Sequence, residues 1–189
     1  MLRNNLPALA MLRRHTFVVM VFVLGLPASA GTADSQVSIR AQDVNGHAVA
    51  VNGKGHFTVV MYTNPDLEDA SRAMTLALDP YRSRSNFTLV RVVDLRGNVP
   101  PEMRSIVRVQ IRQEQVKECA RLKKAGVVAN SDQSPIIPDF SGSTLDALGW
   151  DSVYDQVHLV VYDAHGREIK RMECVTDAKQ MTKVVDSIL

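Results

Sequence analysis

The sequence predicts a single α/β domain that begins with a β-hairpin. Three apolar runs rich in β-branched residues are typical of buried strands, at residues 56–63, 87–94 and 156–163. After the first run, apolar residues recur at steps of three and four, as on one face of a helix. Turn sequences precede the first run and follow the last, at Asn45-Gly46 and at Asp163-Ala-His-Gly166.

The first 30 residues have the pattern of a cleavable export signal. An apolar run at residues 17–26 follows three arginines, and Ala28-Ser29-Ala30 supplies the small residues that a signal peptidase reads. The run is shorter than the roughly 20 residues that a membrane-spanning helix needs. We therefore expect a signal peptide at residues 1–30 and a single mature domain at residues 31–189. This domain is expected in the periplasm, or alternatively secreted, with no stable membrane anchor.

Loss of this segment changes the charge of the protein. The whole chain has 22 Lys and Arg against 20 Asp and Glu. Because the first 30 residues contain three arginines and no acidic residue, the mature domain has 19 basic and 20 acidic side chains. A nearly neutral domain lacks the long-range field that attracts nucleic acid, so we expect no nucleic-acid partner.

The first half of the domain is predicted to contain a hairpin, a strand, a helix and a second strand. Strands at residues 37–43 and 47–51 flank Asn45-Gly46, a dipeptide favoured in two-residue hairpin turns. After the strand at residues 56–63, Asn64 is placed to cap a helix, and the proline that follows suits the first helical position. The buried stripe of this helix is expected at Leu67, Ala70, Met74, Ala77 and Tyr81.

Residues 101–124 allow two interpretations. Val107, Val109 and Ile111 alternate with polar residues as in a strand, whereas residues 113–124 strongly favour a helix. We favour a helix, because the chain has to cross back over the sheet here. Its apolar face would then contain Met103, Ile106, Ile111, Val116, Cys119 and Leu122.

The last third of the chain is predicted to end in a strand hairpin and a helix. Residues 134–139 are expected to be a short extended piece, and Ser143 is expected to cap a short helix that ends at Leu148. The charged run at residues 167–175 suits a strand at the sheet edge. Thr176 is expected to cap the final helix. The buried stripe of that helix is expected at Ala178, Met181, Val185 and Ile188.

This order of elements resembles the thioredoxin-like superfamily, and its leading hairpin resembles the redoxin branch of peroxiredoxins and TlpA-like proteins. Asp43-Val-Asn-Gly-His-Ala-Val49 is similar to the opening of redoxin domains, and Val160-Val-Tyr-Asp-Ala-His-Gly-Arg167 to the hairpin near their end. The resemblance covers residues 37–189. It implies a thioredoxin-like three-layer α/β/α sandwich with a mixed central sheet and an added N-terminal β-hairpin.

The residues that carry thiol chemistry in that superfamily have no counterpart here. The Cys-x-x-Cys of the family would fall at Leu67-Glu68-Asp69-Ala70, and its cis-proline would fall near Val157. The chemistry depends on a thiolate stabilised at a helix N-terminus. Dithiol exchange and single-cysteine peroxidase chemistry at this turn are therefore excluded.

Four polar residues at the same turn form the main candidate binding group: Asn64, Asp66, Glu68 and Asp69. They occupy the surface where members of the superfamily bind and react, so one interpretation is a recognition site for a peptide, cation or partner. The other interpretation, which we favour, is ordinary helix capping and complementation of the helix dipole.

Four further residues are candidates outside the turn. Cys119 and Cys174 form a structural disulfide, act as a redox pair, or are free thiols, because spacing alone does not decide pairing. Trp150 either offers an exposed aromatic ring to a partner or anchors a loop against the core. His158, next to the position of the family's cis-proline, either contributes to binding or is a core histidine.

These features favour a redox-inactive thioredoxin-like module that binds an envelope protein or peptide. The alternative is an unconventional thiol oxidoreductase or peroxidase that uses Cys119 and Cys174. No P-loop, dinucleotide fingerprint or nucleophile elbow occurs, and the histidines share no metal-ligand spacing. We therefore expect no cofactor and no metal.

Overall fold

The structure is a computed structural model of the 189-residue chain, and it describes residues 39–53, 55–127, 134–150 and 156–189. All of these residues belong to one compact unit, Ser35–Leu189. The predicted signal peptide lies outside the described residues. Within the described ranges, no helix is both long enough and apolar enough to cross a membrane.

Five strands form one mixed sheet in the order β5-β4-β3-β6-β7. The predicted apolar runs are its three inner strands, β4 (Phe87–Asp94), β3 (Phe57–Thr63) and β6 (Val157–Tyr162). Strand β4 is parallel to β3 and to β5 (Ile136–Asp139), whereas β6 is antiparallel to β3 and to β7 (Glu168–Val175). The expected short extended piece is therefore a strand of the sheet. Pro138 is tolerated in β5 because β5 is an edge strand.

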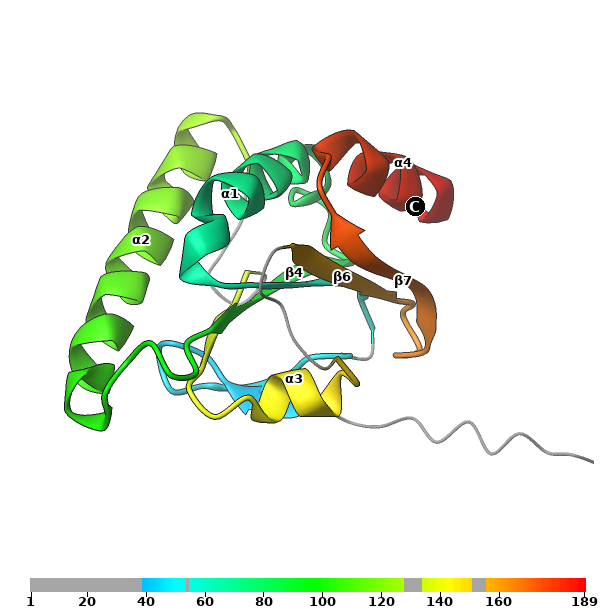
Figure 1. Cartoon of the computed structure of the whole chain (residues 1–189). Coiled ribbons are helices and arrows are strands. Elements are labelled where there is room, and N and C mark those ends of the chain that lie inside the picture. Colours follow the sequence, from blue (N-terminus) through cyan, green and yellow to red (C-terminus); the bar gives the residue numbers. More distant parts are fainter. Residues whose placement is uncertain (1–38, 54, 128–133, 151–155) are drawn as a thin grey trace, which may run out of the picture. The chain divides into compact units, whose positions relative to one another are not determined.

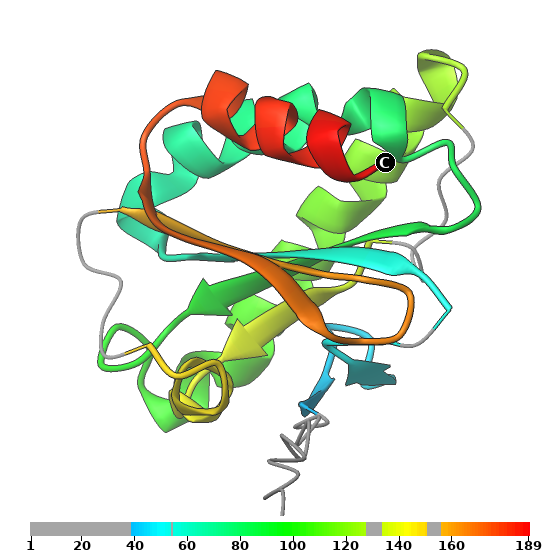
Figure 2. The ribbon, with the colours of Figure 1, turned by 90° about the vertical axis from the view of Figure 1, so that its right-hand side faces the viewer.

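Helices cover both faces of the sheet (Figures 1 and 2). Helices α1 (Glu68–Ala77) and α4 (Ala178–Ile188) lie together over one face, and both predicted apolar stripes pack into the core there. Helix α3 (Ser143–Ala147) and the hairpin of β1 (Arg40–Gln42) and β2 (Ala48–Ala50) cover the other face. The core on that side contains Val51, Val60, Tyr62, Val90, Leu145 and Trp150.

The hairpin β1–β2 closes with a three-residue loop rather than the predicted two-residue turn. The backbone N–H of Asp43 donates to the carbonyl of His47 at 3.0 Å, and Gly46 has a φ of 86°. The Asp43 carboxylate accepts two backbone N–H groups of the loop at 2.8 Å each. Asp163 and Gly166 take the same places in the loop between β6 and β7. An aspartate followed by a glycine three residues later therefore builds the same loop twice.

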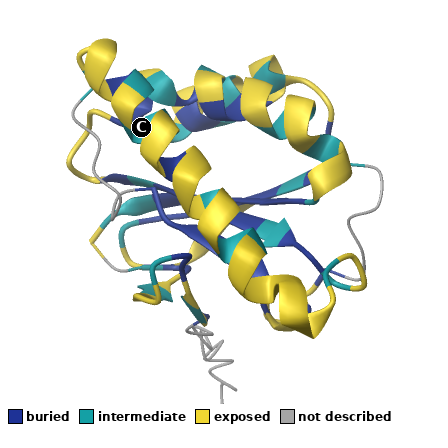
Figure 3. Ribbon diagram, turned by 90° about the vertical axis from the view of Figure 1, so that its left-hand side faces the viewer, coloured by how far each residue is buried: buried dark blue, intermediate teal, exposed yellow. Residues whose placement is uncertain are grey.

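Helix α2 (Arg104–Lys124) follows a 3-10 turn at Pro101–Met103, which confirms the helical interpretation of this stretch. Its predicted apolar face is wrong, because three members of that face are 42 to 63% exposed, namely Met103, Ile106 and Val116. The buried residues are Gln115 and Leu122. The Gln115 amide donates to the Ser134 carbonyl at 3.0 Å, so α2 is held partly by polar contacts. Figure 3 shows how much of its outer surface is exposed.

Two predicted helix caps are replaced by neighbouring residues. Ser143 is the first residue of α3, Gly142 precedes it with a φ of 83°, and the Asp139 carboxylate accepts the free N–H groups. Asp177 rather than Thr176 caps α4, accepting the N–H two residues on at 2.8 Å. In both places an aspartate supplies the cap, since its charge complements the positive end of a helix.

Candidate functional site

The turn between β3 and α1 is the position at which the resemblance implies thiol chemistry. It is built as a helix start, because Asn64 Oδ1 accepts a hydrogen bond from the N–H of Leu67 at 3.1 Å. Pro65 opens a 3-10 turn that leads into α1. The first turn of α1 then contains the carboxylates of Glu68 and Asp69 and no sulfur atom.

The three acidic side chains of this turn, Asp66, Glu68 and Asp69, are all exposed. Carboxylates at the first turn of a helix complement the positive end of its dipole, so their presence has a structural reason. Exposure also leaves them accessible to a partner. Their role in binding stays a prediction.

The strand register brings one further candidate residue to the same end of the sheet. Tyr62, near the end of β3, is the cross-strand partner of His158, near the start of β6. Val157, at the position of the family's cis-proline, pairs with Val175 of β7. The α1 turn and the start of β6 are therefore neighbours, as the resemblance implies.

Trp150 packs against His158 instead of standing on the surface. Its side chain is only 4% exposed, and the two ring centroids lie 5.2 Å apart at an interplanar angle of 63°. The Tyr62 ring lies 5.9 Å from the Trp150 ring, and the guanidinium carbon of Arg171 lies 5.0 Å from the centre of that ring. Trp150 thus anchors its loop against the core, and the interpretation as an exposed binding aromatic is wrong.

Burial lowers the pKa of His158; Glu173 opposes this effect and Arg171 adds to it. The imidazole is therefore neutral at pH 7. Its Nδ1 atom and Nε1 of Trp150 are both buried without a hydrogen-bond partner in the described part of the chain. Buried polar atoms without a hydrogen-bond partner are uncommon in folded proteins. At this end of the sheet they occur in the Trp150–His158 ring pair.

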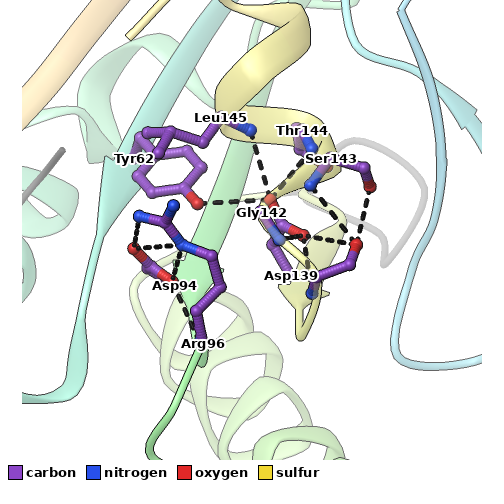
Figure 4. A network of polar contacts seen from close by, with 9 residues as sticks. Tyr62, Asp94, Arg96, Asp139, Gly142, Ser143, Thr144 and Leu145 are labelled. Atoms are coloured by element: carbon purple, nitrogen blue, oxygen red, sulfur yellow. Dashed lines mark hydrogen bonds and ion pairs between the residues drawn. The ribbon is translucent and has the colours of Figure 1, made fainter. Parts of the chain in front are cut away.

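Asp139, which the sequence analysis did not single out, organises a polar network at the ends of β4 and β5 (Figure 4). Its carboxylate accepts backbone N–H groups at the start of α3, the shortest at 2.8 Å, and the Tyr62 hydroxyl at 3.2 Å. Asp94, its partner in the parallel register, accepts the Arg96 guanidinium at 2.7 Å. The network therefore joins β3, β4, β5 and α3.

This network is structural rather than catalytic. Each Asp139 oxygen accepts at least two hydrogen bonds, so neither is available as a general base. Burial raises the pKa of Tyr62, as do the carboxylates of Asp139 and Asp94, so its hydroxyl stays protonated and donates. The available signal was Asp139-Phe-Ser-Gly-Ser143, a turn sequence in which the aspartate side chain accepts nearby backbone N–H groups.

A groove of about 480 Å³ lies beside this network. Its walls come from the β1–β2 hairpin, from β5, from the start of α3 and from the first half of α2. Arg40, Arg104 and Arg108 line it. The guanidinium carbons of the last two lie 5.3 and 5.1 Å from the centre of the Phe140 ring. Sequence reasoning missed the groove because its arginines come from distant segments of a domain whose net charge is close to zero.

Cys119 and Cys174 are both free thiols. Cys119 is half-buried in α2, which packs against β5, and Cys174 is exposed in β7 at the opposite edge of the sheet (Figure 1). Neighbouring strands are about 4.8 Å apart, whereas the Cα atoms of a disulfide lie within about 7 Å. The structure therefore does not bring the two cysteines together.

The chain matches no protein-family model and no curated protein. Solved structures do match it. The exposed lipoprotein thioredoxin of Streptococcus pneumoniae is 12% identical, with a TM-score of 0.52, and the match covers 79% of this chain and 98% of that one. MTB DsbF is 17% identical with a TM-score of 0.52, covering 82% and 97%.

A third match is a secreted Mycobacterium tuberculosis disulfide oxidoreductase homologous to E. coli DsbE. It is 12% identical, with a TM-score of 0.50, and the match covers 82% of this chain and 99% of that one. At such identities the likeness shows the fold alone. The fold is thioredoxin-like, as the sequence predicts, with the two-stranded hairpin added before the mixed sheet.

Proposed function

We propose that the protein is an exported binding module of the cell envelope that has a thioredoxin-like fold and no thiol chemistry at the α1 turn. One observation carries this proposal. The turn that would hold a Cys-x-x-Cys contains Glu68 and Asp69, and the only two cysteines of the chain lie in α2 and β7.

The charges at the turn give the physical reason. A reactive thiolate is stabilised by the positive end of a helix dipole. Here the Asn64 side chain and two carboxylates occupy that end. A negative charge added among them would be repelled, so this turn suits recognition better than nucleophilic chemistry.

Export is supported by the signal-like pattern of the first 30 residues. Two of the compared proteins are described as an exposed lipoprotein and as secreted, which fits the same compartment. The partner we propose is an envelope protein or peptide. Three residues of the main candidate binding group, Asp66, Glu68 and Asp69, are exposed and accessible to it, and the fourth, Asn64, is half-buried. His158, a candidate outside the turn, is also half-buried.

The first experiment tests the loss of thiol chemistry. Insulin-reduction and peroxide-reduction rates are measured for the purified protein and for Cys119→Ser and Cys174→Ser, with an active thioredoxin as positive control. We expect rates at the reagent background for all three forms. Turnover by the native protein that either serine variant abolishes would overturn the proposal in favour of the alternative, an unconventional oxidoreductase.

The second experiment tests binding at the turn. A photo-crosslinking amino acid replaces Asp66, and in a matched control it replaces Lys183, which is exposed on α4. We expect a discrete adduct with an envelope protein from position 66 and none from position 183. Equal adducts at both positions, or none at either, would remove the turn as a recognition surface.

A further inference from the structure

We propose that the groove lined by Arg40, Arg104 and Arg108 binds a peptide segment of a partner protein that carries carboxylate side chains. This inference rests on the proposed binding function and gives it a second surface, separate from the α1 turn. None of the three arginines belongs to the binding group predicted from the sequence.

The start of α2 carries charges that oppose its own stability. Arg104 is the first residue of the helix, Arg108 lies one turn later, and the first turn contains no acidic residue. Cations near a helix N-terminus and like charges four residues apart are both unfavourable. A local conflict of this kind is expected at a functional site, where a ligand removes it.

The groove arginines lack the carboxylate partners that six of the nine other described arginines have. Those six form ion pairs with Asp or Glu. By contrast, none of the three groove arginines forms an ion pair with a described residue, so their charges remain uncompensated there. A carboxylate is a fitting external partner, because a guanidinium binds it through two parallel hydrogen bonds.

The acidic residue that lines the groove does not neutralise it. Asp139 is 3% exposed, and its oxygens are occupied by the N–H groups at the start of α3 and by the Tyr62 hydroxyl. With three guanidiniums and this one carboxylate, the groove lining has a formal charge of +2. The lining is therefore complementary to an anionic ligand.

Apolar residues in the same groove favour a peptide over a small inorganic anion. The guanidiniums of Arg104 and Arg108 both lie within cation–π distance of the Phe140 ring. Ala41 and Ala48 supply further apolar surface, whereas Ile137 and Pro138 line the groove but are buried. An inorganic anion would leave this surface in water, whereas a peptide places carboxylates on the arginines and covers apolar surface at the same time.

The test uses two fluorescein-labelled octapeptides that differ only in having glutamate or glutamine at alternate positions. Fluorescence anisotropy measures their binding to the purified protein. We expect the glutamate peptide to bind more tightly and its affinity to fall as salt rises. The double variant Arg104→Gln/Arg108→Gln should weaken its binding about tenfold, since two charge-assisted contacts are lost.

A matched control is Arg72→Gln/Arg84→Gln, which removes the same charge from two exposed arginines outside the groove. The affinity of this control variant for the glutamate peptide should stay within about twofold of the native value, which is the change expected from net charge alone. If circular dichroism shows that the groove variant is unfolded, Arg40→Gln on the hairpin wall tests the same site.

Several outcomes would overturn the assignment. One is equal affinity for both peptides, and another is an equal loss of affinity in the control variant and the groove variant. The others are no binding at millimolar peptide and inorganic phosphate that binds as tightly as the glutamate peptide. The insulin assay on the same preparations separates the two proposals. Absent peptide binding without insulin turnover removes only the groove, whereas cysteine-dependent turnover removes the proposed function.

Discussion

Arg82 and Glu118 form a buried ion pair beneath α2, and the same carboxylate also pairs with Arg91 of β4. The side chain of Arg82 is 2% exposed and that of Glu118 is 12% exposed. Arg82 also donates to the Ser134 hydroxyl at 2.6 Å. Burial lowers the pKa of Arg91, and Glu118 opposes this effect by favouring the charged form. One carboxylate thus compensates two guanidiniums and attaches α2 to the rest of the domain.

Glu118→Gln should lower the free energy of unfolding by about 3 kcal/mol, because it removes the counter-charge of Arg91 and leaves Arg82 only its longer contact with Asp79, at 3.5 Å. Equilibrium urea denaturation measures the loss. Glu114→Gln is the matched control, since Glu114 lies on the same helix, is 66% exposed and, among the described residues, forms an ion pair only with the exposed Lys117. We expect no measurable change from the control. A similar loss from both substitutions would contradict the role of the buried pair.

Asp139→Asn should destabilise the protein by about 2 kcal/mol, because the uncharged amide accepts fewer of the N–H groups at the start of α3. Thermal or urea unfolding measures the change. Asp146→Asn is the control, an exposed aspartate in the same helix whose side chain caps nothing in the described region.

Tyr62→Phe removes one donor to Asp139 and should lower the free energy of unfolding by about 1 kcal/mol. Unfolding midpoints for Asp139→Asn equal to those of the native protein would contradict the network.

The fold could be predicted because its inner strands are recognisable in the sequence as apolar runs. Strands β3, β4 and β6 are buried on both faces of the sheet, so they are continuous apolar runs, and α1 and α4 pack on apolar cores. The absence of the family's cysteines at the α1 turn could also be predicted, because it is read directly from the sequence. These predictions depend on residue type and spacing alone.

The inward face of α2 could not be predicted in this way. Gln115 is buried because Asn45 donates to its side chain at 3.2 Å and because it donates to Ser134 at 3.0 Å. Glu118 faces inward, with its side chain 12% exposed, because it pairs with two arginines. Hydrophobic periodicity detects helix faces that pack on apolar residues, and these partners come from remote parts of the chain. The groove arginines could not be predicted either, because they too come from remote parts of the chain.

Stability should fall as the pH drops from about 7.5 to 5, in part because of His158. Burial lowers the pKa of His158 in the folded protein below its ordinary value of 6.5. In this window the unfolded chain therefore binds a proton that the folded protein does not, and the free energy of unfolding rises with pH. Urea denaturation at both pH values measures the difference.

His158→Gln removes that proton-linked contribution, so its stability should change less between the two pH values than that of the native protein. His165→Gln replaces an exposed histidine and should follow the native protein. If His158→Gln shows the full native pH dependence, the imidazole of His158 is not its source.

Gly142→Ala should destabilise the protein through two separate effects. Gly142 has a φ of 83°, which costs a residue with a Cβ about 1 kcal/mol. The added Cβ would also overlap Cδ of Arg96, whose guanidinium holds Asp94. Gly97→Ala is a matched control, because Gly97 has a φ of 70° and nothing within 4 Å of the added atom. The excess loss in Gly142→Ala, about 1 kcal/mol by urea denaturation, therefore measures the displacement of Arg96.

An Arg96→Ala background tests this cause directly. With the arginine side chain removed, Gly142→Ala should cost no more than Gly97→Ala, because only the left-handed backbone conformation remains to be accommodated. The two glycine substitutions together separate backbone strain from side-chain overlap at the point where α3 meets the end of β4. An excess that persists without Arg96 would contradict the assigned cause, because Arg96 supplies all of the nearest atoms that the added Cβ would meet.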